Sequence, residues 1–342
     1  MLLFDFGVGL ESGIVVVDRG VLDAERVVAV AASGSWVVAA CATKTLRCFD
    51  LRDGRVTEGV APRKPSAVAI ATDILVVACG GELHATKVPD LGKPVFCLGH
   101  TSSVITCVAF SYDERLVATC DRNEKIRVSA WPQTALIEAF CLGHTDFVSS
   151  CVFAADRMLA SCGGDGTLRL WDATTGSELF RATVEGCCTC LAATSDALAL
   201  GTAKEGIVRI FDIDCRLSTS LPLPTPPVDL RFLRDDTLVA LVSDPEVILV
   251  QFDRTGPALY EPARDTTRTA GLVQEAKARS LSPPLSALHA YDDDDDVAGE
   301  PAEDDDDAEA PPILRKHALD RKYDVSLLGP PQKKKNHPRA DD

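Results

Sequence analysis

The sequence predicts an all-β protein built from a repeated four-stranded unit. The first observation is a recurring strand pattern. Short runs of small and β-branched residues stand between turn residues, as at 36–42 (WVVAACA), 73–80 (DILVVACG) and 115–120 (RLVATC), which is typical of β-strands. The second observation is composition: hydrophobic residues make up 46% of the chain and aromatic residues only 6%, so the expected core consists of Val, Ala, Leu and Ile.

The third observation is an internal similarity between residues 98–130 and residues 142–172. The two segments read LGHTSSVITCVAFSYDERLVATCDRNEKIRVSA and LGHTDFVSSCVFAADRMLASCGGDGTLRLWD, and their Gly-His pairs lie 44 residues apart. A repeat of about 40–45 residues that opens on Gly-His and closes on Trp-Asp is typical of the WD repeat, in which each copy folds as one blade of a β-propeller. The sequence therefore predicts a WD-repeat β-propeller.

Weaker copies of the repeat precede and follow these two. We expect six blades, numbered one to six in chain order, at residues 36–54, 66–88, 98–130, 142–172, 186–213 and 227–253. A seventh is expected to combine residues 13–18 (GIVVVD) with strands near residues 255–290, because closing the ring covers the sheet edges. The propeller should thus occupy residues 1–290. Residues 291–312 are expected to form a disordered acidic linker, and residues 313–342 a basic tail that can hold a short helix.

Blade four carries the complete WD signature. His144 precedes its first strand, Ser161 lies on the second, Asp165 in the following turn and Trp171 on the third. Similarity to WD repeats implies a side-chain hydrogen-bond network through these four residues, with the indole N–H at one end. A fully paired buried network fixes one packing. The same residue types occur in hydrolytic triads, but this spacing favours the structural role.

Blade three lacks the closing Trp. Thr119 stands for Ser161, Asn123 for Asp165 and Ser129 for Trp171. Drift of a single repeat, with charges that are merely solvated, is one interpretation of this change.

The third strands of blades three and four favour a second interpretation. Each carries an arginine between aliphatic residues, Arg127 and Arg169, and strand alternation places each arginine on the opposite face from its neighbours. We expect the two arginines to lie side by side on successive blades, with Lys125 and Arg122 nearby. A basic patch on an acidic propeller is a plausible docking site for a protein with an acidic surface.

The stretch DRNEKIRVS (121–129), with the following FCLGHTDFVS and GGDGTLRLW, resembles the WD-repeat, non-catalytic subunit of the eukaryotic tRNA (guanine-N7-)-methyltransferase. The resemblance covers about residues 97–172, and the family usually has Asp where this chain has Asn123. It implies a heterodimer in which a catalytic subunit binds S-adenosylmethionine and forms 7-methylguanosine in the tRNA variable loop. It further implies that the WD-repeat subunit, which has no cofactor of its own, stabilises the catalyst and helps to position tRNA. We expect this chain in the nucleus and also in the cytoplasm.

The resemblance also implies that Arg169 pairs with an acid on the methyltransferase, and we extend this role to Lys125, Arg127 and Arg122. The alternative for Arg169 is a strand arginine that pairs within the propeller. If Arg169 docks the partner, its reversal to Glu should remove the partner and leave the propeller folded. The chain itself is not expected to be an enzyme, because it shows neither a glycine-rich cofactor loop nor a converging acid, base and nucleophile.

Charge and cysteine usage give further expectations. Residues 291–310 hold 12 acids and no base, and residues 311–342 hold eight bases against four acids. Since phosphate neutralisation supplies most nucleic-acid affinity, tRNA contact is expected to be local, from Arg315, Lys316, Arg321 and Lys322. Residues 333–335 (KKK) can act as a nuclear address. A solvated tail without specific contacts is the alternative.

Six of the thirteen cysteines fall in expected strands, where a free thiol acts as a small hydrophobe in a reducing compartment: Cys41, Cys79, Cys107, Cys120, Cys151 and Cys162. Cys187, Cys188 and Cys190 suggest a metal, but no second ligand group stands at zinc spacing, so none is expected. No apolar run reaches the roughly 20 residues of a membrane span. The chain opens without a basic leader, so a secretory signal is not expected.

Other scaffold functions remain as alternatives. The tetrapeptide Phe49-Asp50-Leu51-Arg52 resembles a short box in WD-repeat substrate receptors of cullin-type ubiquitin ligases, although it also reads as an ordinary strand end. The acidic tract suits a histone-binding or splicing scaffold. Neither alternative accounts for the DRNEKIRVS stretch.

Overall fold

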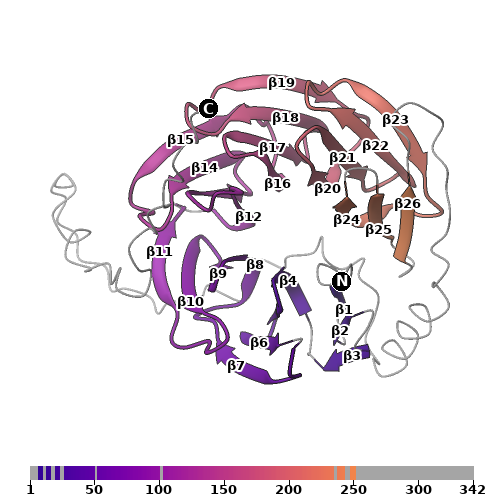
Figure 1. Ribbon diagram of the computed structural model, residues 1–342. Helices are drawn as coiled ribbons and strands as arrows, with labels where there is room; N and C mark the ends of the chain where they lie inside the picture. Colours follow the sequence, from indigo (N-terminus) through magenta and orange to yellow (C-terminus); the bar gives the residue numbers. More distant parts are fainter. Residues whose placement is uncertain are drawn as a thin grey trace, which may run out of the picture.

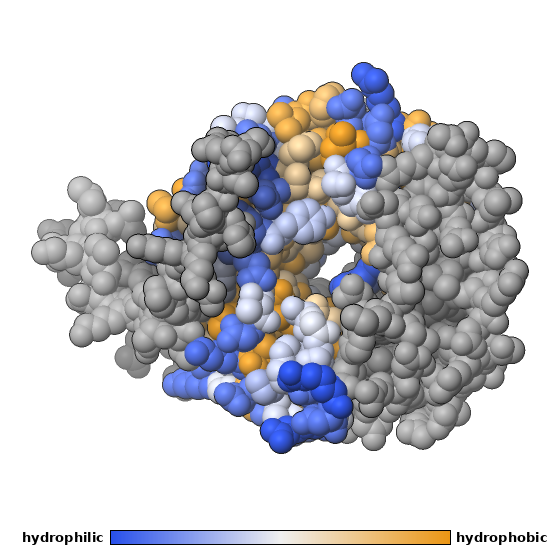
Figure 2. Space-filling model, in the orientation of Figure 1, coloured by the Kyte–Doolittle hydropathy of each residue, from blue (hydrophilic) through white to orange (hydrophobic). Residues whose placement is uncertain are grey.

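The computed structural model describes residues 7–10, 13–16, 20–23, 27–50, 52–100, 103–234, 237–242 and 247–251. These residues form seven antiparallel sheets, which follow one another around a ring (Figure 1). Viewed along the axis of the ring, the molecule has an opening near its centre (Figure 2). The predicted all-β propeller is therefore confirmed. The described residues contain no helix that could span a lipid bilayer.

Each sheet has its strands in the same order from the centre of the ring outwards. The first strands, nearest the centre, are β1 (Gly7–Leu10), β4 (Val27–Ser33), β8 (Pro65–Ala71), β12 (Ile105–Phe110), β16 (Val148–Ala155), β20 (Cys188–Ala193) and β24 (Pro227–Arg234). The second strands are β2 (Gly13–Val16), β5 (Trp36–Cys41), β9 (Ile74–Cys79), β13 (Leu116–Asp121), β17 (Met158–Gly163), β21 (Ala197–Thr202) and β25 (Thr237–Val242).

The third strands are β3 (Gly20–Asp23), β6 (Thr45–Asp50), β10 (Glu82–Lys87), β14 (Lys125–Ala130), β18 (Thr167–Asp172), β22 (Ile207–Asp212) and β26 (Val247–Gln251). The outer strands are β7 (Val56–Val60), β11 (Val95–Gly99), β15 (Ile137–Leu142), β19 (Glu178–Thr183) and β23 (Leu217–Pro222). Blades one to six are thus β4–β7, β8–β11, β12–β15, β16–β19, β20–β23 and β24–β26, as the repeats predict.

The seventh sheet differs in detail from the prediction. It consists of β1, β2 and β3, and the segment 13–16 is its middle strand, paired to β1 on one edge and to β3 on the other. Direct pairing of residues 13–16 with strands near 255–290 is excluded, because both edges of β2 are used within the N-terminal segment. The prediction that strands near 255–290 belong to the same blade is not tested by this pairing. Residues 255–290, the linker 291–312 and the tail 313–342 lie outside the described residues.

The core lies between the blades. Second strands such as β9 and β21 are buried along their whole length, because each sheet is covered by a neighbouring blade on both faces. This is why their sequences, ILVVAC and ALALGT, are almost continuously apolar instead of alternating. The side chains at the contact of blades three and four include Val128, Cys141, Phe153 and Trp171.

The cysteines are part of this core. All thirteen are free, and the described residues contain no cluster of three or more side chains that could hold a metal ion. The register shifts between Cys188 and Cys190 on β20. Cys188 accordingly packs in the core shared with blade four, and Cys190 in the core shared with blade six. Burial raises the pKa of the Cys188 thiol to about 12, so this thiol stays protonated at neutral pH.

A tight turn of blade four, between β18 and β19, packs against the outer strand of blade three. Gly176, between β18 and β19, has a φ of 73°, which favours glycine. A methyl group built on its Cα would collide with the backbone carbonyl of Phe140 on β15. The turn therefore rests directly on the backbone of the neighbouring blade.

We expect Gly176→Ala to lower the free energy of unfolding by at least about 2 kcal/mol, because it adds a collision between blades to backbone strain. Gly186→Ala is the matched control. Gly186 also has a positive φ, 93°, but a methyl group there meets nothing within 4 Å, so only about 1 kcal/mol of strain is expected. Urea unfolding of both variants measures the difference. Equal losses would mean that the blade contact does not stabilise the fold.

Candidate partner-binding site on blades three and four

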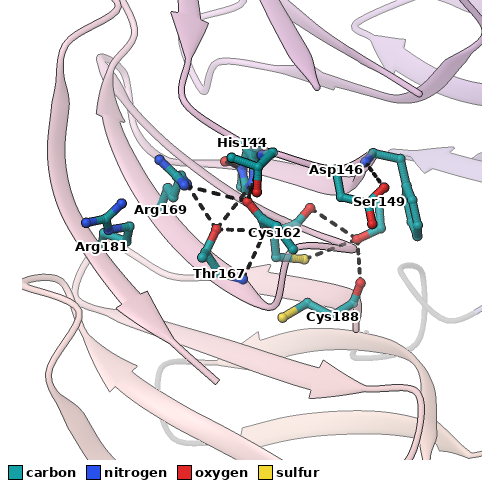
Figure 3. A network of polar contacts seen from close by, with 12 residues as sticks. His144, Asp146, Ser149, Cys162, Thr167, Arg169, Arg181 and Cys188 are labelled. Atoms are coloured by element: carbon teal, nitrogen blue, oxygen red, sulfur yellow. Dashed lines mark hydrogen bonds and ion pairs between the residues drawn. The ribbon is translucent and has the colours of Figure 1, made fainter. Parts of the chain in front are cut away.

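Blade four joins the four predicted signature residues in one buried network. Figure 3 shows His144 of this network with Thr167 and Arg169 beside it. The Trp171 indole N–H donates to Ser161 Oγ at 2.8 Å. The Ser161 hydroxyl lies 2.8 Å from His144 Nε2, and His144 Nδ1 lies 2.9 Å from Asp165 Oδ2. These contacts are satisfied together when the serine hydroxyl donates to Nε2 and the Nδ1–H donates to the carboxylate. The imidazole is then neutral, and its tautomer is fixed.

Arg169 extends this network to the outer strand. Its Nε donates to Thr167 Oγ1 at 2.9 Å, and the Thr167 hydroxyl donates to Asp165. Its Nη1 donates to the Glu178 carboxylate on β19, and its Nη2 lies 3.6 Å from Asp165 Oδ2. The guanidinium carbon stands 5.9 Å from the Trp171 ring centroid. The arginine is thus held between two acids and an indole.

This arrangement differs from the expected basic patch. Arg169 is only 4% exposed, and its charge is met by acids of its own blade. Arg127 faces the preceding blade, where its Nη1 donates to the Gly99 carbonyl at 3.1 Å. The two arginines therefore lie in two successive blade contacts, and Arg169 does not add an exposed charge to the expected basic patch. Alternation gives the side of the strand but not the groups that stand against it.

Blade three keeps most of the network without the indole. His100 Nε2 lies 2.7 Å from Thr119 Oγ1, and His100 Nδ1 lies 3.0 Å from Asp121 Oδ2. The acid is Asp121, not the expected Asn123, which is exposed. A signal for this exists in the sequence: in both blades the acid follows its histidine by 21 residues.

Asp121 also organises the turn that follows it. Its Oδ1 accepts the backbone N–H groups of Asn123 and Lys125, each at 2.9 Å. The side chains of Arg122 and Lys125 are consequently held at the surface, where both residues are exposed. The predicted set of four cations thus divides into two surface residues, the half-buried Arg127 and the buried Arg169.

At the strand position of the indole blade three has Ser129, which the side chain of Arg127 contacts. Arg127 Nε donates to Ser129 Oγ at 2.9 Å, and Nη2 donates to the Thr134 carbonyl at 2.8 Å. Thr134 is itself buried, with its hydroxyl on the Cys97 carbonyl. The arginine therefore ties the third strand of blade three to its own β14–β15 loop and to β11 of blade two.

Burial shapes the charge states of both histidines. Burial lowers the pKa of His144 below its ordinary 6.5, and the opposing pull of Asp165 does not overcome it. The pKa of His100 is lowered in the same way, against the pull of Asp121. Burial alone would raise the pKa of Asp165, but hydrogen bonding from Thr167 and the neighbouring His144 bring it below its ordinary value. A neutral imidazole beside a carboxylate is therefore the native state of both networks.

The short box of the cullin alternative lies at the end of β6. Arg52 makes two contacts with Asp50, Nε to Oδ1 at 3.1 Å and Nη2 to Oδ2 at 2.9 Å. Its guanidinium carbon stands 4.8 Å from the Trp36 ring centroid. These contacts are those of a strand end that stabilises its own turn. Arg315, Lys316, Arg321 and Lys322, predicted to contact tRNA, lie outside the described residues.

The fold and the two networks define the class of this protein, a WD-repeat β-propeller. Residues 85–217 match the family model of the tRNA methyltransferase TRM82 WD40 domain. Solved structures support the fold alone. A chain of the Mitotic Checkpoint Complex has a TM-score of 0.62 at 17% identity and covers 72% of this chain and 81% of its own. The computationally designed Ika8 protein has a TM-score of 0.56 at 22% identity, over 70% and 77% of the two chains.

Curated relatives agree with the family model. The tRNA (guanine-N(7)-)-methyltransferase non-catalytic subunit wdr4 of Xenopus laevis is 32% identical over 232 residues, which are 59% of this chain and 57% of that protein. The non-catalytic subunit wuho of Anopheles gambiae is 44% identical over 101 residues, 30% and 25% of the two chains. That of Culex quinquefasciatus is 38% identical over 160 residues, 44% and 40%.

The chain thus covers 25% to 57% of the length of these three relatives. Both blades that carry the predicted site, β12–β15 and β16–β19, fall inside the matched residues 85–217. The resemblance indicated by the sequence is therefore confirmed: this chain is similar to the WD-repeat, non-catalytic subunits of tRNA (guanine-N7-)-methyltransferase.

Because Arg169 is buried and paired with two acids, we expect it to stabilise the folded propeller. Arg169→Glu should place a third acid beside Asp165 and Glu178 and lower the free energy of unfolding by about 3–5 kcal/mol, as breaking a buried ion pair does. The sequence predicted that this reversal leaves the propeller folded, whereas the buried ion pairs predict a loss of stability. Arg181→Glu, beside it on β19 and with a side chain 56% exposed, is the matched reversal and should cost less than about 1 kcal/mol. Equal effects in urea unfolding would contradict the buried pairing.

The neutral histidines make stability depend on pH. An unfolded chain takes up a proton on His144 near pH 6.5, whereas the folded network does so only at lower pH, so stability falls as pH drops below about 6.5. Each such histidine contributes up to about 1.4 kcal/mol per pH unit in this window. His144→Gln should reduce the loss of unfolding free energy between pH 7.5 and pH 5.5. An unchanged slope would show that His144 does not stay neutral.

Proposed function

We propose that this chain is a non-catalytic subunit that docks and stabilises a tRNA (guanine-N7-)-methyltransferase, which forms 7-methylguanosine in the tRNA variable loop. The observation that carries the proposal is the match of residues 85–217 to the TRM82 WD40 domain. That match contains the altered blade three and the complete blade four. The names of the relatives agree with it, since each is called a non-catalytic subunit of this methyltransferase.

The geometry suits a rigid docking part. The histidines of blades three and four are engaged in blade networks with hydroxyl groups and carboxylates. Polar groups that are paired in this way fix a single packing and hold a surface still. In this proposal S-adenosylmethionine binds to the catalytic partner, and this chain needs no cofactor.

Partner contact is assigned to the side of blades three and four, where Lys125 and Arg122 are exposed. Arg127 and Arg169 support that surface from within, because their guanidinium groups tie strands together. Contact with tRNA is assigned to Arg315, Lys316, Arg321 and Lys322, and nuclear import to residues 333–335. The cullin-receptor alternative has no comparable support, since the matched family model and the relatives are all named for the tRNA methyltransferase.

Co-expression tests the function directly. The catalytic subunit should co-purify with this chain in a one-to-one complex, and 7-methylguanosine in tRNA should rise at least about tenfold over the catalytic subunit alone, because docking holds the catalyst in its active shape. Mass spectrometry of digested tRNA measures the product. A catalytic subunit that neither binds this chain nor gains activity from it would refute the proposal.

The same complex tests the assigned residues. Lys125→Glu, at an exposed position, should weaken binding of the catalytic subunit, and Lys87→Glu, exposed at the end of β10 of blade two, is its matched control.

A chain that ends at residue 310 should bind the catalytic subunit normally and bind tRNA more weakly. Unchanged tRNA affinity would remove the tail from the tRNA site, and a fluorescent fusion without residues 333–335 that still enters the nucleus would remove the import assignment.

A further inference from the structure

The loops at one end of blades one and two gather positive charge. The turn between β5 and β6 carries Lys44, and the connection from β7 to β8 carries Arg63 and Lys64. All three cations are exposed. The strand register places the two loops at the same end of the sheet, since Thr45 at the start of β6 pairs with Val60 at the end of β7. We call these three cations the basic face.

Hydrogen bonds hold the backbone of these loops in place. The Ala61 N–H donates to the Lys44 carbonyl at 2.8 Å, and the Cys79 thiol donates to the Arg63 carbonyl at 3.4 Å. Burial raises the pKa of this thiol, whereas the hydrogen bond to Arg63 and the charges of Arg63 and Lys44 lower it. Both cations therefore lie close to Cys79, and the peptide groups behind the basic face are fixed before any ligand binds.

The same end of the molecule continues into blade three. The Ile105 N–H donates to the Gly80 carbonyl at 2.8 Å, and the Arg122 N–H donates to the Val104 carbonyl at 3.1 Å. Figure 1 shows blades one, two and three in succession around the ring, from β6 and β7 through β10 to β14. The basic face therefore runs on into the turn that carries the exposed Arg122 and Lys125.

Charge divides this end of the propeller into two halves. The described loops of blades one and two hold three bases and no acid, at residues 42–44, 61–64 and 80–81. Glu82, at the start of β10, stands beside them, and its carboxylate lies 3.2 Å from His84 Nε2. The loops of blades four and five hold four acids and one base, at residues 143–147, 164–166, 184–187 and 203–206. A polyanion is therefore attracted to the first half and repelled from the second.

The surroundings of the basic face suit phosphate groups better than a protein. These loops include no large exposed hydrophobic side chain, and the nearest along the chain is Val60 at the end of β7. Gly80 and Gly81 have no side chain to offer. Protein interfaces depend on buried apolar anchors, whereas contacts to a nucleic-acid backbone come from Lys, Arg, hydroxyl groups and backbone N–H groups. The exposed Thr43 supplies such a hydroxyl beside Lys44.

We propose that the basic face binds the phosphate backbone of RNA and holds part of the tRNA that is presented to the catalytic subunit. The proposal rests on the proposed function, in which that subunit docks at the blade-three end of the same surface. Pro62 and Pro65 flank Arg63 and Lys64 and limit their backbone freedom, so little ordering is required when phosphates bind. This contact on the propeller is additional to the one assigned to the tail.

The salt dependence of tRNA binding tests the proposal. The variant carries Lys44→Gln, Arg63→Gln and Lys64→Gln in the full chain, and its complex with the catalytic subunit is titrated with tRNA between about 50 and about 200 mM salt. We expect the tRNA affinity to fall at least about tenfold at the lowest salt. The slope of log K against log salt should decrease by about 2 to 3, because each lost phosphate contact releases about one counterion fewer. Fluorescence anisotropy measures both.

The matched control removes three cations from the opposite end of the same two blades, by Arg55→Gln, Lys87→Gln and Lys93→Gln. Arg55 precedes β7, Lys87 ends β10 and Lys93 precedes β11, and all three are exposed. Both variants have the same net charge, so the control should keep the wild-type affinity and slope if the basic face is a site. An equal loss in the two variants would reveal a general effect of charge and overturn the proposal, as would no loss in either.

A photo-crosslinking residue in place of the exposed Thr43 identifies the occupant in the complex. Crosslinks to tRNA support the proposal. Crosslinks only to the catalytic subunit would assign the basic face to a protein contact and overturn it, while the proposed function would stand. A wild-type chain that does not bind the catalytic subunit would instead refute the proposed function. Titration of tRNA onto the wild-type chain and the two variants alone then decides for or against the basic face.

Discussion

The contact between the third strand of one blade and the outer strand of the blade before it governs this structure. Two antiparallel sheets that diverge from the centre leave a wedge between them, and large side chains must fill it. In blade four the wedge holds Trp171, whose indole N–H is tied to Ser161 and whose ring lies beside Arg169. Packing and hydrogen bonding are therefore satisfied by the same residue.

Blade three solves the same problem in a different way. Its histidine, hydroxyl and acid are present as His100, Thr119 and Asp121, so the polar part of the network survives without the indole. Arg127 links blade three to blade two and to its own β14–β15 loop through three hydrogen bonds, to Ser129, Gly99 and Thr134. Trp131, two residues after Ser129, packs against the core at this contact, and a pocket lies beside Phe96 and Arg127. The blade that departs from the signature is thus well ordered and keeps a concave surface.

The role of charge in this protein follows from the same contacts. Arg169 forms ion pairs with Asp165 and Glu178. Its charge therefore stabilises the fold and is not exposed for a partner. Buried ion pairs of this kind give little net stability but penalise any change to one partner. The exposed cations Lys125 and Arg122 sit on a turn that Asp121 organises. A partner at this edge would therefore meet a rigid surface of mixed apolar and basic character.

The sequence alone determined the repeat, the six readable blades and the signature of blade four. These features depend on contacts within one repeat, whose residues stand at fixed spacings along the chain, so a pattern of His144, Ser161, Asp165 and Trp171 is enough to place them. The sequence also contained the 21-residue spacing that identifies Asp121. The strand positions alone favour Asn123, because they do not take into account the distance along the chain from the histidine.

Only the tertiary structure decided what lies between blades. Alternation along β14 and β18 gives the side on which Arg127 and Arg169 project, but a side chain can meet solvent or a neighbouring blade on that side. Glu178, the Gly99 carbonyl and Thr134 come from other strands and loops, and their positions depend on the angle and separation of adjacent sheets. The burial of Arg169, the assembly of the N-terminal sheet and the pocket beside Arg127 therefore follow from the packing of blades against one another, which no single repeat encodes.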